Sequence, residues 1–314
     1  QINLAVPLLP ALTQFVLQPL YVAGLARAFG LRPYVILGLV LCATTPGGNG
    51  SNLAEVIFHG NVELGIFCTC FSTLLAAAAI PINYEVHVVP VLADEQDAQI
   101  PWVAIGSAVG ILLVGVTGGT LVRYWRDDLG LKLEKWLVKI AVVLLALGII
   151  AATVQTAYIW PLLGWQTWLV GVLAPLPKFV VTYGLGKAAR LGVGATRTIA
   201  MEAGEQNIAV ALAIISLGWA ASPQRDEILS GLMVYTLFNQ ATATPLVTLG
   251  FWLAWRREER LKAGADTESE LGTPRDRTTA DETGQQPAFG AGQANPSDVL
   301  SPSRDPHSSS AARG

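Results

Sequence analysis

Long apolar runs follow one another along most of this chain, and they constrain its fold more than any other feature. A helix needs about 20 mostly apolar residues to cross the roughly 30 Å hydrocarbon core of a bilayer. Short connections separate eight candidate spans: 4–26, 34–58, 63–89, 101–122, 136–157, 165–188, 197–219 and 227–255. Charged residues make up only 14% of the 314 residues, against about 25% in an average soluble domain. The sequence therefore predicts an all-α polytopic membrane protein.

The distribution of Lys and Arg predicts the orientation of the spans. With the connections numbered in order, the odd ones hold Arg27, Arg32 and Arg225. The even connections and the start of the tail hold a larger set: Arg123, Arg126, Lys132, Lys135, Lys187, Arg190, Arg197, Arg256, Arg257, Arg260 and Lys262. Because these residues accumulate on the cytoplasmic side, the first span should begin in the cytoplasm and the C-terminal tail should lie there too. We expect a multi-pass protein of the plasma membrane.

The chain divides into a membrane domain, 1–262, and a tail, 263–314. The tail is rich in Ser, Thr, Pro, Gly, Asp and Glu, and it holds almost no large apolar residues. Such a segment cannot bury enough surface to offset its conformational entropy, so we expect it to be disordered. At the other end, Gln1 opens the chain inside an apolar segment without a basic region or cleavage site. This start is expected of a fragment rather than of a signal peptide.

The second span is interrupted by the polar, glycine-rich stretch 44–52, which reads Thr-Thr-Pro-Gly-Gly-Asn-Gly-Ser-Asn. Proline removes a backbone donor, and glycine makes continued helix costly. Polar groups at this depth cannot face lipid, because each unsatisfied one costs several kcal/mol. We therefore predict a broken helix whose freed carbonyls and amides line a cavity.

The seventh span contains a comparable stretch, 201–207, which reads Met-Glu-Ala-Gly-Glu-Gln-Asn. A glycine among two carboxylates and two amides predicts a second unwound segment. Ionisable groups inside a membrane are candidates for a functional site. A structural ion pair is the alternative, and Lys178 in the sixth span is the only nearby cation in the sequence.

The two interrupted spans lie five spans apart, so they cross the bilayer in opposite directions, and one long span follows each. Paired interrupted helices at corresponding positions of two halves are typical of a secondary transporter built as an inverted repeat, with its site near the midplane. Half-helix C-terminal ends and free carbonyls favour a cation, whereas N-terminal ends favour an anionic group. The pattern therefore predicts a carrier.

Four segments resemble the bile acid:sodium symporter family. Residues 46–52 are similar to its P-G-G-N-x-S-N signature, and residues 202–207 are similar to its E-x-G-x-Q-N signature. Residues 13–20 resemble its A-Q-F/Y-x-x-M-P-L helix, and residues 69–73 match a Thr/Ser-rich stretch that follows the first signature. The resemblance extends over roughly residues 4–260.

The resemblance implies two domains that move relative to each other. A core, 34–89 and 165–255, would be built on two crossing broken helices, beside a panel, 4–26 and 101–157. In the family one or two helices precede the helix of Gln14. They are absent from this sequence, so part of the panel would be missing.

The resemblance also implies two sodium sites and a substrate site. The first sodium site would use Ser51, Asn52, Thr69 and Glu202. The second would use Gln14, Glu202 and Gln206, with main-chain carbonyls near Ala203 and Glu205. Ligation by oxygen alone suits a hard cation. The anionic group of the substrate would lie near the N-terminal ends of the second half-helices, at Asn49, Gly50 and Asn207.

Three residues depart from the pattern of the family. A serine of some members falls at Gly65, so one cation ligand would be lost or replaced by water. Glu205 stands where the family usually has an uncharged residue; a solvent-facing position is favoured, and a proton-carrying position that changes the coupling ion is the alternative. Lys178 stands in an apolar stretch, where we expect snorkelling or pairing rather than substrate contact.

The predicted function is sodium-coupled symport of organic anions by alternating access. Two sodium ions would accompany a bile acid, a steroid conjugate or a smaller organic acid. A non-transporting sensor or scaffold on a degenerate carrier fold and a proton-coupled carrier remain as alternatives, which Gly65 and Glu205 motivate. The net charge of −3 gives no reason to expect a nucleic-acid partner. An enzyme is the weakest option, because His59, His87 and His307 form no triad or metal cluster in the sequence.

Overall fold

The structure, a computed structural model, describes residues 6–93 and 101–271, which form helices with short connections and one isolated β-bridge. Three elements are π-helical turns (η1, η2 and η4) and one is a 3₁₀ turn (η3). In chain order the elements are α1 (Leu8–Leu12), η1 (Thr13–Leu17), α2 (Gln18–Ala28), α3 (Pro33–Ala43), α4 (Asn49–Ile57), α5 (Val62–Asn83), η2 (Tyr84–Val88), α6 (Trp102–Trp125), α7 (Asp127–Thr156), η3 (Trp160–Leu162), α8 (Trp165–Leu173), α9 (Leu176–Ala188), α10 (Val193–Gly204), α11 (Ile208–Gly218), α12 (Arg225–Phe238), η4 (Asn239–Ala243) and α13 (Thr244–Leu271).

Two units divide the chain, 1–265 and 266–314, and the description below concerns the first. The expected start of a disordered tail at 263 is wrong, because α13 continues to Leu271. The rest of that prediction, 272–314, lies outside the described residues.

Several helices are long and apolar enough to cross a membrane. In the described part of the chain they are Leu8–Ala28, Val62–Val88, Trp102–Trp125 and Trp165–Ala188. Many large apolar side chains lie exposed on the helices, as expected of a surface that meets lipid rather than water. The prediction of an all-helical, polytopic membrane protein is confirmed.

Both predicted interruptions are present, but they are shorter than expected. The gap between α3 and α4 is 44–48, and the gap between α10 and α11 is 205–207. Residues 49–52 and 201–204 are therefore helical, which corrects the sequence-based boundaries. They occupy the first turn of α4 and the last turn of α10, where many backbone groups have no partner within the helix. Glycine and polar residues are consequently tolerated there.

Each of the three π-helical turns is followed by a proline two residues after its end. Pro19 follows η1, Pro90 follows η2 and Pro245 follows η4. Proline has no N–H to donate to the carbonyl one turn earlier, and its ring crowds that carbonyl, so the helix widens locally. Such turns are frequent at functional sites, and η1 and η4 each contain a glutamine, Gln14 and Gln240.

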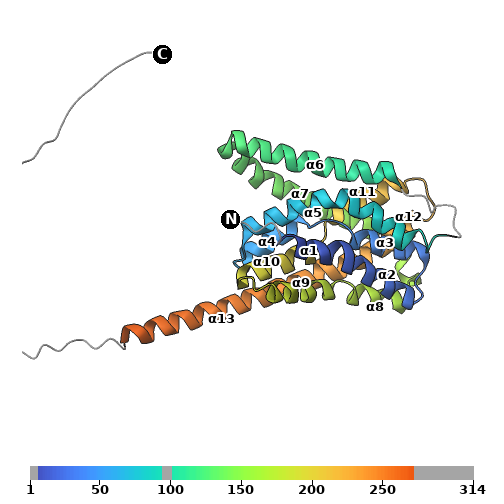
Figure 1. The fold of residues 1–314 in the computed structure, drawn as a ribbon. Coiled ribbons are helices and arrows are strands. Elements are labelled where there is room, and N and C mark those ends of the chain that lie inside the picture. The colour runs from blue at the N-terminus through green and yellow to red at the C-terminus, as the bar shows by residue number, and fades with distance from the viewer. Residues whose placement is uncertain (1–5, 94–100, 272–314) are drawn as a thin grey trace, which may run out of the picture. The chain divides into compact units, whose positions relative to one another are not determined.

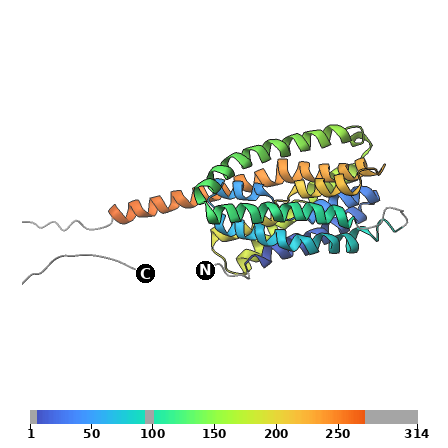
Figure 2. The ribbon, with the colours of Figure 1, turned by 90° about the horizontal axis from the view of Figure 1, so that it is seen from above.

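The helix before the first interruption packs closely on a neighbour. α3 lies against α12, and glycines from both helices form the contact. A Cβ on Gly38 would approach Leu232 N to 2.9 Å, and one on Gly231 would collide with the carbonyl of Val35. Similarly, α10 lies against α9, while α6 packs on α5, α7 and α11 (Figures 1 and 2). Small residues allow such close approach between helices in membranes.

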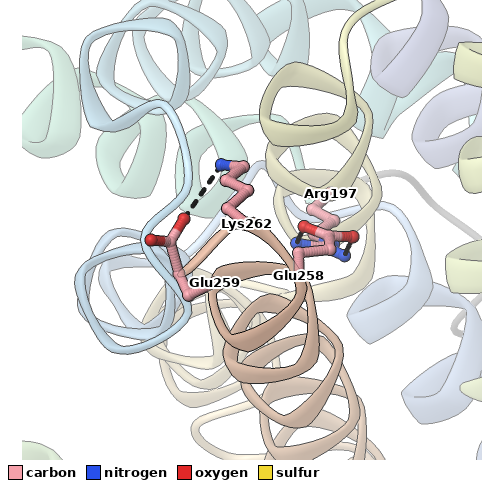
Figure 3. A network of polar contacts seen from close by, with 4 residues as sticks. All are labelled: Arg197, Glu258, Glu259 and Lys262. Carbon is pink, nitrogen blue, oxygen red and sulfur yellow. Dashed lines mark hydrogen bonds and ion pairs between the residues drawn. The ribbon is translucent and has the colours of Figure 1, made fainter. Parts of the chain in front are cut away.

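A bidentate ion pair joins α10 to α13 (Figure 3). Arg197 Nη2 donates to Glu258 Oε1 at 2.6 Å, and Nη1 donates to Oε2 at 3.3 Å. The Arg197 side chain is 7% exposed, whereas that of Glu258 is 42% exposed. A second pair, Glu259–Lys262, lies close by on the exposed surface of α13.

Candidate functional site

The two interrupted helices meet through their backbones. Gly47 and Gln206 form an isolated antiparallel β-bridge. On either side of it, Gly48 N donates to Glu205 O at 3.2 Å, and Asn207 N donates to Pro46 O at 2.9 Å. Unwound backbone inside a membrane must be satisfied by protein groups. Each interruption therefore provides the hydrogen-bond partners that the other lacks.

A glutamine from η1 and a glutamine from η4 each contact one interruption. Gln14 Nε2, from η1, donates to Thr45 O at 2.9 Å. Gln240 Nε2, from η4, donates to Gln206 O at 3.1 Å. Each glutamine stands five residues before a proline. The first and the last span therefore contact the two interruptions in the same way, through a glutamine that donates to a main-chain carbonyl. The sequence analysis did not single out Gln240, although its spacing from Pro245 repeats that of Gln14 from Pro19.

Gln206 joins the end of α3 to the second interruption. Its Nε2 donates to Ala43 O at 3.2 Å, and its Oε1 accepts from Thr45 Oγ1 at 3.3 Å. Because Gln14 also reaches Thr45, the structure brings together two of the three side chains expected at the second sodium site, Gln14 and Gln206. Ala203 lies in the last turn of α10, directly after Glu202 and two residues before Glu205 in the sequence.

Glu202 is fully buried where α4, α5 and α10 meet. Its Oε2 lies 2.7 Å from the Ser51 hydroxyl, which also lies 2.8 Å from Gly48 O. The Thr69 hydroxyl is within reach of the same carboxylate. A Cβ on Gly47 would collide with Glu202 Oε1, so the glycine makes room for this oxygen. Ser51 and Thr69, two of the residues expected at the first sodium site, thus contact Glu202.

Three buried oxygens at these positions accept no hydrogen bond. They are Gln14 Oε1, Asn52 Oδ1 and Glu202 Oε1. A buried acceptor without a donor is costly, and these three acceptors belong to residues that were expected to bind sodium. Carboxylate and amide oxygens are the ligand types that hard cations prefer. These oxygen atoms are therefore a set of ligands that fits sodium.

Glu55 is a second fully buried carboxylate, which the sequence analysis missed. Both of its oxygens are without a hydrogen-bond partner. It lies in α4 against Gly65 of α5, where a Cβ would collide with the carboxylate. Glu55 lies inside the predicted span 34–58, so the principle that ionisable residues inside a span are functional candidates would have found it.

Glu205 is buried rather than solvent-facing, with 4% of its surface exposed. Its Oε2 accepts a hydrogen bond of 2.7 Å from Thr244 Oγ1. Glu205 also lines a cavity of about 420 Å³ between α4 and α13, whose other walls are mainly apolar. Cavities of this size accommodate small organic molecules.

Lys178 does not snorkel, because it is 1% exposed. Its Nζ donates to the Tyr235 hydroxyl at 3.0 Å and lies over the rings of Phe179 and Tyr235. Its charge is close enough to interact with that of Glu205. The hydrogen bond that the structure gives Lys178 is therefore to a phenol hydroxyl rather than to a carboxylate.

The three residues expected to bind substrate lie at the start of the second half-helices. Asn49 is the first residue of α4, and Gly50 follows it and lines the cavity. Asn207 immediately precedes α11 and is half-buried. Both half-helices therefore begin beside the β-bridge.

Comparison of the sequence with known proteins identifies a family that this chain matches. Residues 5–160 match the pattern of the Sodium Bile acid symporter family. The human P3 protein is 29% identical over 210 residues, which cover 67% of this chain and 44% of that protein. The ileal sodium/bile acid cotransporter of rabbit (Oryctolagus cuniculus) is 27% identical over 249 residues, 78% of this chain and 70% of the relative. Human sodium/bile acid cotransporter 4 is 29% identical over 240 residues, 75% and 54% of the two lengths.

The fold is that of a helical membrane protein, and the relatives come from a family of transporters rather than of enzymes. The chain belongs to the sodium bile acid symporter family. It spans less than half the length of the P3 protein that it matches.

Proposed function

We propose that this protein is a sodium-coupled symporter that carries organic anions by alternating access. Two sodium ions bind at the junction of the interrupted helices, with Glu202 between them. The core, 34–89 and 165–255, rocks against the panel, 4–26 and 101–157, and both solutes leave into the cytoplasm. The protein lies in the plasma membrane with its C-terminal tail in the cytoplasm, as the Lys and Arg distribution suggests.

The observation that carries this proposal is the set of unpaired oxygens beside the β-bridge. Gln14 Oε1, Asn52 Oδ1 and Glu202 Oε1 are buried without donors. A bound cation would satisfy all three at once. The names of two relatives, which specify sodium/bile acid cotransport, support the same coupling ion.

An inverted repeat is supported by the equivalent surroundings of the two interruptions. Gln14 and Gln240, each five residues before a proline, donate to the first and second interruption respectively. The N-terminal ends of α4 and α11 both lie at the junction. Helix N-termini favour the binding of an anionic group. The adjacent apolar cavity would accept the carbon skeleton of the substrate.

Uptake into proteoliposomes that contain the full chain tests the proposal. A panel of labelled organic anions is offered with an inward sodium gradient, and choline replaces sodium in a parallel sample. We expect uptake only with sodium. Equal uptake in choline would refute sodium coupling. Uptake in choline that follows an imposed proton gradient would support the proton-coupled alternative, for which the buried Glu205 is the motivating observation.

Glu202→Gln tests the assignment of the central carboxylate. We expect uptake to fall to background, because both sodium ions lose their shared negative ligand, while the protein still purifies as a folded species. Sodium should also cease to raise the melting temperature, since ligand stabilisation requires binding. Glu85→Gln, at an exposed carboxylate of η2, serves as the control. Transport near the wild-type level in Glu202→Gln would remove this residue from the site.

A further inference from the structure

Glu55 stands out among the buried groups because nothing in the described structure balances its charge. Its side chain is 0% exposed, and both carboxylate oxygens are without a hydrogen-bond partner. Burial of an unpaired carboxylate is expensive. A residue of this kind needs a proton or a cation close to it.

The Glu55 carboxylate fills the space that a side chain at position 65 would occupy. A Cβ on Gly65 would collide with both oxygens of the Glu55 carboxylate. Gly65 lies one helical turn before Thr69 on α5, so the two positions face the same way. Since Thr69 reaches Glu202, a group held against Gly65 lies beside the first of the two proposed sodium sites.

The unpaired oxygens around this point come from two helices, α4 and α10. Glu55 lies one turn after Asn52 on α4, whose Oδ1 is unpaired. Glu55 and Glu202, whose Oε1 is also unpaired, lie close enough for their charges to repel. Two like charges that approach each other in a buried site are stabilised by a cation between them.

We propose that Glu55 is a direct ligand of the sodium ion bound beside Ser51, Asn52, Thr69 and Glu202, in place of the side chain that Gly65 lacks. The inference rests on the proposed function. It corrects the expectation that this ligand is lost or replaced by water. The first site then carries two carboxylates, so the negative charges of Glu55 and Glu202 match the charge of two sodium ions.

Sodium-dependent thermal stabilisation tests this inference without transport. The purified full chain is heated at increasing sodium chloride, with choline chloride added to constant ionic strength, and the sodium concentration at half-maximal stabilisation is recorded. Loss of even an outer-shell partner typically weakens metal binding 10- to 100-fold, so Glu55→Gln should raise this midpoint at least about tenfold. Glu63→Gln, at an exposed carboxylate of α5, should leave it unchanged.

A pair of double variants tests the same point if Glu55→Gln does not fold. Glu55→Ser/Gly65→Ser restores an oxygen at position 65, whereas Glu55→Ser/Gly65→Ala does not. The serine pair should respond to sodium at lower concentration than the alanine variant. An unchanged midpoint in Glu55→Gln, or equal midpoints in the two double variants, would overturn the assignment of Glu55. A wild-type protein that sodium does not stabilise would instead refute the proposed function itself.

Discussion

Carboxylates in this protein lie against glycines. A Cβ on Gly47 would meet Glu202, one on Gly50 would meet Glu205, and one on Gly65 would meet Glu55. In each case the glycine leaves room for a buried acidic side chain. The residue opposite a buried acid is therefore as constrained as the acid itself.

Gly47→Ala should abolish the effect of sodium on stability. The added methyl group would displace Glu202 Oε1, and overpacking of this kind typically costs about 1–3 kcal/mol. The melting temperature should fall, and its dependence on sodium should disappear. Gly24→Ala in α2 is the matched control, because no atom lies within 4 Å of its Cβ position. A normal sodium response in Gly47→Ala would contradict the placement of Glu202 Oε1 at the cation.

For individual residues, the sequence predicted which side chains lie at the site better than it predicted their burial and their contacts. Ser51, Thr69, Glu202 and Gln206 lie at the junction because their motifs set them on the interrupted helices. The burial of Glu205 could not be predicted, since it depends on contact with Thr244, a residue of α13 that lies 39 positions later in the sequence. Likewise, only the fold shows that Glu55 occupies the space beside Gly65.

Among the elements, α3 and α12 make the closest contact that involves facing glycines. The backbone at Gly38 approaches Ile228 and Leu232, and the backbone at Gly231 approaches Val35. Lipid provides no hydrophobic force to press helices together, so close packing must stabilise this pair. The contact fixes the half-helix that leads into the first interruption.

Gly38→Ala and Gly231→Ala should each lower the melting temperature of the protein. A methyl group at either position would force α3 and α12 apart, at a cost of about 1–3 kcal/mol. Gly184→Ala in α9 is the control: its Cβ position is open, and alanine favours helix over glycine by about 1 kcal/mol. Thermal unfolding in detergent measures the difference. Melting temperatures at or above wild type for both α3 and α12 variants would refute the role of this contact.

The elements themselves were largely predictable, because hydrophobic length and glycine-proline content decide where helices run and break. The stretches 44–52 and 201–207 were correctly expected to interrupt their spans. Their exact limits were not, since end turns tolerate the same residues that unwound segments contain. The π-helical turns were also missed, because a proline in a long span signals distortion without specifying its kind.

For the whole membrane unit, Arg197 and Glu258 link the helix before the second interruption to the last helix. The guanidinium is almost fully buried, whereas the carboxylate is partly exposed. Removal of the carboxylate would leave a buried charge without this partner, which is more costly than loss of an exposed pair. The bidentate geometry also fixes the relative position of α10 and α13.

Glu258→Ala should therefore destabilise the protein by about 1–3 kcal/mol. Glu259→Ala is the matched control, because its exposed pair with Lys262 lies at the adjacent position and should contribute little. Melting temperatures of the two variants in the same detergent measure the contrast. Equal values for Glu258→Ala and Glu259→Ala would show that the link does not hold α13 in place.

The β-bridge between Gly47 and Gln206 has a consequence for how such carriers diversify. Its flanking hydrogen bonds run from main-chain N–H groups to main-chain carbonyls, which every residue except proline can supply in full. The hydrogen bonds between the two interruptions therefore depend little on side-chain identity, although Gly47 and Gly48 leave little room for a Cβ. A lineage can exchange the solutes and ions it recognises, by altering the groups around this point, while the way its halves join is inherited unchanged.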